Sequence, residues 1–178
     1  RIRAAPCVER RLDDVTDILD AAAPTGPLPP VGIIGQAPAL LWPTGAWESV
    51  VASQTATHFP REQLAGLARV YKSVARAESF NVMEREAWSS LYAMVGPGRR
   101  LDSASEARLR EALSQARLAN RMLMTSASSL MDGASRQNLP YSSEDLESIA
   151  AAKRTPLTGD RTGMLGGNGL ARDRVFVG

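Results

Sequence analysis

The longest amphipathic pattern in the chain runs from Asp102 to Met131, and it limits the possible folds most strongly. Its apolar positions recur at steps of three and four residues, which is the period of one face of an α-helix. The stripe consists of Leu109, Leu113, Ala116, Asn120, Leu123, Ala127 and Leu130. A helix of this length spans roughly 40 Å at 1.5 Å per residue. It needs an equally long partner, so the pattern predicts a helical hairpin.

The natural partner is the segment from Pro60 to Val95, whose apolar residues follow the same period. Proline is tolerated in a first helical turn, so Pro60 marks a start, although the pattern leaves open a break near Asn81. Gly96-Pro97-Gly98 ends this segment, and the short connection predicts that the two helices are antiparallel.

The ends of the second helix carry their own signals. Asp102 or Ser103 is expected to cap its start, and Ser103 with Glu106 three residues later matches a capping box. Gly133 is expected to end it, because glycine favours the left-handed conformation that closes many helices. An ion pair is expected between Glu106 and Arg110, four residues apart on the helix.

Composition supports an all-α fold. Of the 178 residues, 44% are hydrophobic but only 5% are aromatic, so alanine, leucine, valine and methionine supply most of the apolar volume. This balance suits closely packed helices better than a β-sheet. We therefore predict a small antiparallel helical bundle built around the hairpin.

The remaining segments are divided by proline and glycine. Residues 1–23 are predicted to form a possible membrane-proximal flank and a helix from Glu9 to Ala23, and residues 24–43 a Pro-rich strap. Residues 44–153 form the helical domain, which opens with a helix capped by Thr44 and ends with a short helix reaching Lys153. Residues 154–178 are a Gly-rich tail, expected to be flexible or ordered only by a partner.

Residues suited to catalysis or metal binding are scarce. The chain has one histidine, His58, and one cysteine, Cys7, and its carboxylates show no metal-ligand or acid–base spacing. Neutral-pH chemistry usually draws on these groups. The sequence therefore predicts a protein that is not an enzyme and that uses no cofactor and no metal.

Two rows of basic residues form the main candidate binding site. They are Arg69, Lys72 and Arg76 in the first long helix and Arg110, Arg117 and Arg121 in the second. If the helices pair so that the rows meet, one basic ridge would face phosphates or an acidic partner. The alternative is that each row is the solvated face of its own helix. The net charge of +2 is small, and it gives little support to nucleic-acid binding.

Trp42 and Trp47 flank Pro43 at the end of the strap. Their large rings suit two roles: pinning the strap to the bundle, or lying at a membrane or partner interface. We take pinning as the first expectation.

The order of features resembles a loose group of uncharacterised bacterial membrane-anchored proteins with a helical domain. The residues that carry the resemblance are Arg1-Ile2-Arg3-Ala4-Ala5-Pro6-Cys7-Val8, Leu28-Pro29-Pro30-Val31-Gly32, Trp47, Trp88, and Arg100-Leu101-Asp102 leading into Leu109–Arg117. The resemblance implies no particular activity. It implies membrane association, through a segment upstream of Arg1.

Together these features predict a non-catalytic interaction, sensor or scaffold domain of a membrane-associated bacterial protein, with a protein partner. The alternative is binding of nucleic acid or another polyanion through the paired arginine rows. The sequence does not indicate the oligomeric state.

Overall fold

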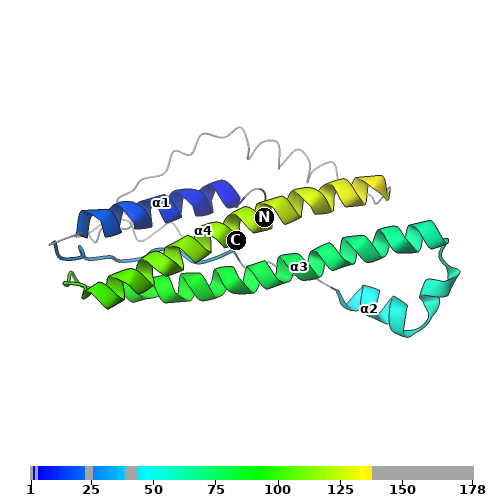
Figure 1. Cartoon of the computed structure of the whole chain (residues 1–178), viewed down its shortest axis with the longest axis horizontal. Helices are drawn as coiled ribbons and strands as arrows, with labels where there is room; N and C mark the ends of the chain where they lie inside the picture. The colour runs from blue at the N-terminus through cyan, green and yellow to red at the C-terminus, as the bar shows by residue number, and fades with distance from the viewer. Residues whose placement is uncertain (1, 3, 23–25, 39–43, 138–178) are drawn as a thin grey trace.

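The computed structural model describes residues 2, 4–22, 26–38 and 44–137. Two long helices, α3 (Arg61–Leu91) and α4 (Ser103–Arg136), run antiparallel and form a hairpin (Figure 1). A Cβ atom added to Gly133 would lie 3.3 Å from Val70 Cγ2, and one added to Gly66 would meet the side chain of Gln137. Residue 70 therefore faces residue 133, which defines the register of the hairpin.

Both long helices differ in detail from the sequence prediction. α3 passes Asn81 without a break and tightens into the short 3₁₀ helix η2 (Tyr92–Met94). At the start of α4, the Asp102 carboxylate accepts a hydrogen bond from the Ser105 backbone N–H at 2.7 Å, so Asp102 is the cap. α4 also continues through Gly133 to Arg136, so the prediction that Gly133 ends it is wrong. This glycine lies inside the helix, where it faces Val70.

The first helix, α1 (Ala5–Ala22), packs along the N-terminal part of α4 and runs antiparallel to it (Figure 1). It begins four residues before the predicted start at Glu9, because the N–H groups of Cys7 and Val8 already donate to the Ala4 carbonyl. Its predicted apolar stripe is buried and joins residues of α3 and α4 in the core. The α1 members are Val8, Leu12, Val15, Ile18 and Leu19.

Residues 26–38 cross the connection between α3 and α4 without forming a helix. Leu28 pairs with Arg99 and Val31 with Gly96 in two isolated antiparallel bridges, through backbone hydrogen bonds of 2.7–3.0 Å. Leu28, Val31 and Ile34 are buried in the core. Their spacing of three residues matches the period of a polyproline-like segment. Only part of the predicted strap, 24–43, lies within the described residues.

A short helix, α2 (Gly45–Ala52), and the 3₁₀ helix η1 (Thr55–His58) precede α3. We expected one helix from Thr44 to about residue 57, but α2 ends at Ala52, and Gln54 adopts a positive φ of 60°. Thr44 occupies the N-cap position without a side-chain capping hydrogen bond. The Trp47 ring stacks on Tyr71 of α3, with ring centroids 4.9 Å apart. Trp47 therefore attaches α2 to α3.

The register divides the hairpin into two halves. The closed half, residues 81–91 and 103–122, adjoins the connection; the open half, residues 61–80 and 123–136, contains the other ends of α3 and α4.

The described chain is mainly helical, without β-strands, as the all-α prediction requires. The predicted short helix reaching Lys153 and the Gly-rich tail lie outside the described residues.

Candidate functional site

The open half of the hairpin carries apolar side chains that are only half buried. In the described chain, the core cluster is built from α1, residues 28–34, the closed half and Met94 of η2, with no residue of the open half. In the open half only Leu123 is a large buried apolar side chain. The half-buried apolar residues there are Leu64, Leu67, Val70, Tyr71, Val74, Phe80, Met124, Leu130 and Met131. A partly covered apolar surface of this kind is typical of a contact site.

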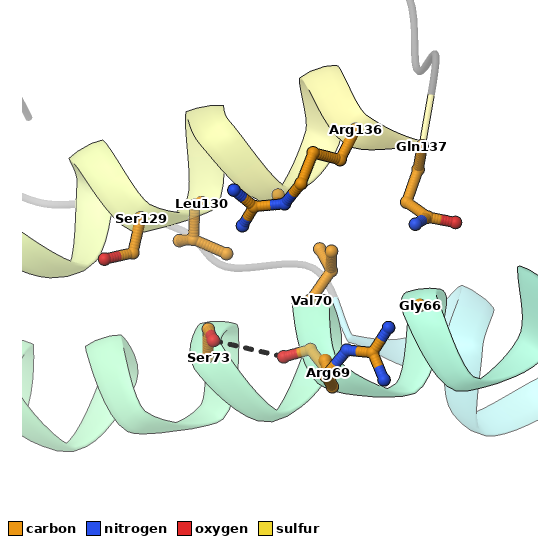
Figure 2. A pocket seen from close by; sticks show the side chains of 9 residues that line it. Gly66, Arg69, Val70, Ser73, Ser129, Leu130, Arg136 and Gln137 are labelled. Atoms are coloured by element: carbon orange, nitrogen blue, oxygen red, sulfur yellow. Dashed lines mark hydrogen bonds between the residues drawn. The ribbon is translucent and has the colours of Figure 1, made fainter. Parts of the chain in front are cut away.

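A groove of about 220 Å³ lies between α3 and α4 in the open half (Figure 2). Val70 and Leu130 supply its apolar surface. Gly66 and Gly133 line it from opposite helices, and each packs against a side chain of the other helix region, Gln137 beside Gly66 and Val70 beside Gly133. No residue of α1 or α2 lines this groove.

Two arginines flank the groove, Arg69 from α3 and Arg136 from α4 (Figure 2). Both are exposed, and neither forms an ion pair with another described residue. None of the nine described lining residues is acidic. Glu62 lines only an adjoining hollow, which it shares with Arg136. The groove therefore combines an apolar surface with two positive charges that no described carboxylate pairs.

The two predicted arginine rows lie in different halves. Arg69, Lys72 and Arg76 are exposed on the open half, whereas Arg110, Arg117 and Arg121 belong to the closed half. Because residue 70 faces residue 133, the register separates the rows along the hairpin. The Arg76 guanidinium lies over the Phe80 ring, 5.8 Å from its centroid. The groove thus includes one residue of the predicted site, Arg69, and adds Arg136.

The arginines of the closed half bind α1. Arg117 contacts the Asp13 carboxylate at 2.6 Å and Arg110 contacts that of Asp20 at 2.8 Å. Arg110 also forms the predicted pair with Glu106, at 2.9 Å. The hydrogen bonds that Arg110 donates to Asp20, and then to Glu106, raise the pKa of Arg110 further above its ordinary value. Two of the three arginines in this row therefore have their charge compensated within the fold.

A set of buried polar residues lies where the two halves meet. Glu84 is fully buried, and Asn81 and Asn120 are nearly so. Each of the three takes part in a polar or electrostatic interaction. Buried polar groups are costly without partners, so such residues commonly hold two helices in one register. Ala77, Asn81, Glu84, Trp88 and Leu91 follow a core period in the sequence.

A second groove, of about 520 Å³, lies in the closed half. Arg99, Arg108 and Glu111 are among its lining residues, so its charges are mixed. The Arg99 guanidinium donates a hydrogen bond to the Ala93 carbonyl, and the Arg108 guanidinium donates to the Ser105 hydroxyl. The two basic residues are thus already engaged locally, unlike those of the open-half groove.

The other candidate residues remain apart. Cys7 is half buried in the first turn of α1, and His58 is exposed at the end of η1. The described residues do not bring three of His, Cys, Asp and Glu together in a metal-binding arrangement. Trp42 lies outside the described residues. Within the described ranges, no helix has both the length and the apolar composition needed to cross a bilayer.

Comparison with known proteins gives no relative: no protein-family model, curated protein or solved structure matches the chain.

Proposed function

We propose that this chain is a non-catalytic helical interaction domain, of the scaffold or sensor kind, and that the open half of its hairpin is the binding surface. The observation that carries the proposal is the unequal covering of the hairpin. α1 and residues 28–34 bury the closed half, whereas the open half keeps a stripe of half-exposed apolar side chains. Covering apolar surface is the main favourable term in most protein association. A protein partner on the open half would complete the bundle.

Matched serines allow a direct test. A photo-crosslinking amino acid at Ser128 or Ser129 samples the open half, and the same amino acid at Ser89 or Ser114 samples the closed half; all four serines are exposed. We expect discrete cross-linked products from the open-half positions of the full-length protein in its own cells. Products from the closed-half positions alone, or from none of the four, would contradict the proposal.

Polyanion binding is the second candidate, and one observation favours it. Arg69, Lys72 and Arg76 are exposed on one helix and form no ion pair with another described residue. A phosphate site should weaken steeply with rising salt. Replacing all three residues with glutamine should then reduce binding to a DNA duplex and flatten its salt dependence. Equal binding by this variant and the parent chain would exclude this site.

Membrane association is a separate part of the proposal, and its support is the order of sequence features. Cells that make the full-length natural product can be fractionated, and the membrane pellet can then be washed with concentrated salt. Retention in the pellet until detergent is added is the expected result. Recovery in the soluble fraction, or release by salt, would exclude an integral anchor.

A further inference from the structure

We propose that the groove between Gly66 and Gly133 receives an acidic amphipathic helix from a protein partner, with carboxylates contacting Arg69 and Arg136. This proposal rests on the proposed function and specifies where and what the open half binds. The groove supplies both parts of such a site. Val70 and Leu130 offer apolar contact, and the two arginines offer charge-assisted hydrogen bonds from opposite sides.

The same molecule already binds one acidic helix. α1 lies against α4 with its apolar stripe in the core, and Asp13 and Asp20 reach Arg117 and Arg110. The two aspartates are seven residues apart, about two helical turns. A helix on α4 is therefore held by apolar residues along one stripe and by carboxylates spaced by two turns. The groove offers the same two kinds of contact, apolar side chains and arginines, with its arginines on the two facing helices.

The shape of the groove also favours a helix. It lies between two antiparallel helices, and an amphipathic helix can lay its apolar face into a groove of this kind. Peptide recognition of this type uses apolar anchors three or four residues apart. A free phosphate ion would engage the arginines and leave the apolar contacts unused.

The test is a selection from a displayed library of 18-residue amphipathic helices. Their polar positions vary among glutamate, glutamine and lysine, and the target is the full chain. We expect glutamate-bearing helices to be enriched. Binding of the enriched helices should fall by about tenfold or more in the Arg69→Gln/Arg136→Gln variant, since charge-assisted contacts carry about 1.4 kcal/mol or more.

The charge-matched control is Arg85→Gln/Arg121→Gln, which removes two exposed arginines outside the groove. It should bind the enriched helices like the parent chain. The reversed variant Arg69→Glu/Arg136→Glu should instead enrich lysine-bearing helices. Because all four arginines are exposed, circular dichroism should show the same helix content and melting temperature for the parent chain and the glutamine variants.

Amide chemical shifts locate the bound helix. Binding of an enriched peptide should shift the Gly66, Val70 and Gly133 amides more than the Ala112 and Gln115 amides in the second groove. Larger shifts in the second groove would overturn the proposal. So would enrichment of neutral or basic helices, no enrichment at all, or equal binding of the enriched helices by the Arg69→Gln/Arg136→Gln variant and the parent chain.

Other occupants give different results. Shifts caused by inorganic phosphate alone, without helix enrichment, would identify an anion site and reject the helix. A dimer in sedimentation analysis that the Arg69→Gln/Arg136→Gln variant abolishes would identify a second copy as the occupant. If Ser128 or Ser129 still forms cross-linked products while the selection fails, this proposal is rejected and the proposed function stands.

Discussion

The closed and open halves of the hairpin use the same two helices in different ways. In the closed half, α1 and residues 28–34 bury Leu91, Leu113 and their neighbours, and aspartates of α1 neutralise Arg110 and Arg117. In the open half, the apolar residues are half exposed, and Arg69 and Arg136 form no ion pair with another described residue.

Under the proposed function, one long hairpin combines folding in one half with binding in the other. A third element is needed to bury the apolar stripes of two paired helices, because each stripe extends beyond their mutual contact. The chain supplies that element over the closed half. Over the open half, the described residues supply only the short α2, held by the stack of Trp47 on Tyr71. The proposed function places a partner there.

The largest expected effect compares one leucine from each half. Leu91 is fully buried in the core, whereas Leu130 is half buried beside the groove. Leu91→Ala should lower the free energy of unfolding by about 2–5 kcal/mol, and Leu130→Ala by about 1 kcal/mol. Urea denaturation followed by circular dichroism measures both values. Equal losses would remove the distinction between the halves.

The attachment of α2 gives the next effect. A double-mutant cycle with Trp47→Ala and Tyr71→Ala isolates the contact between the two stacked rings. A coupling of about 0.5–1.5 kcal/mol is expected from urea denaturation, as for other aromatic pairs. A coupling near zero would mean that α2 does not cover the open half in solution.

The ion pairs of the closed half should contribute less. Asp13 and Arg117 are 2.6 Å apart, but both side chains are substantially exposed. A cycle with Asp13→Asn and Arg117→Gln should give a coupling of about 0.2–1 kcal/mol that decreases with salt. The charge-matched changes Glu48→Gln and Arg121→Gln, at exposed residues of α2 and α4, serve as the comparison. A coupling for Asp13 and Arg117 that is independent of salt would contradict this account of α1 docking.

The smallest expected effect is the pH dependence of the α4 cap. The Ser105 backbone N–H, and then its hydroxyl, lower the pKa of the Asp102 carboxyl below its ordinary value. As pH falls, the unfolded chain takes up this proton first, so the stabilisation present above pH of about 4 is lost. The parent chain should therefore lose stability relative to Asp102→Asn below pH 4 in thermal melts. A difference that is constant with pH would show that the charge is not involved.

The hairpin was predictable because its two stripes are long and have a clear helical period. Its local details depend on contacts that one sequence does not display. Glycine is common at helix ends, which is why Gly133 was expected to end α4. Gly133 instead lies inside α4, where its lack of a side chain allows close packing against Val70. Asp102 and Ser103 are both good caps, and only the geometry shows that Asp102 binds the Ser105 N–H.

The candidate site was less predictable than the fold. Arg69 was identified, but Arg136 lies in the last turn of a helix that was expected to end before it. The register is set by which residues of α3 and α4 face each other. The spacing within each arginine row does not reveal this pairing. The burial of Glu84 was not predicted, because a carboxylate is seldom fully buried. Its position in the apolar stripe of α3 nevertheless indicated the core.

Amide hydrogen exchange across α3 and α4 of the isolated chain tests the division of the hairpin most directly. Amides in residues 84–91 and 109–119 should exchange slowly, because α1 and residues 28–34 must detach before these turns open. Amides in residues 64–74 and 126–134 should exchange markedly faster. Uniform protection along both helices would contradict the account, since it would show that the open half is already as well covered as the closed half.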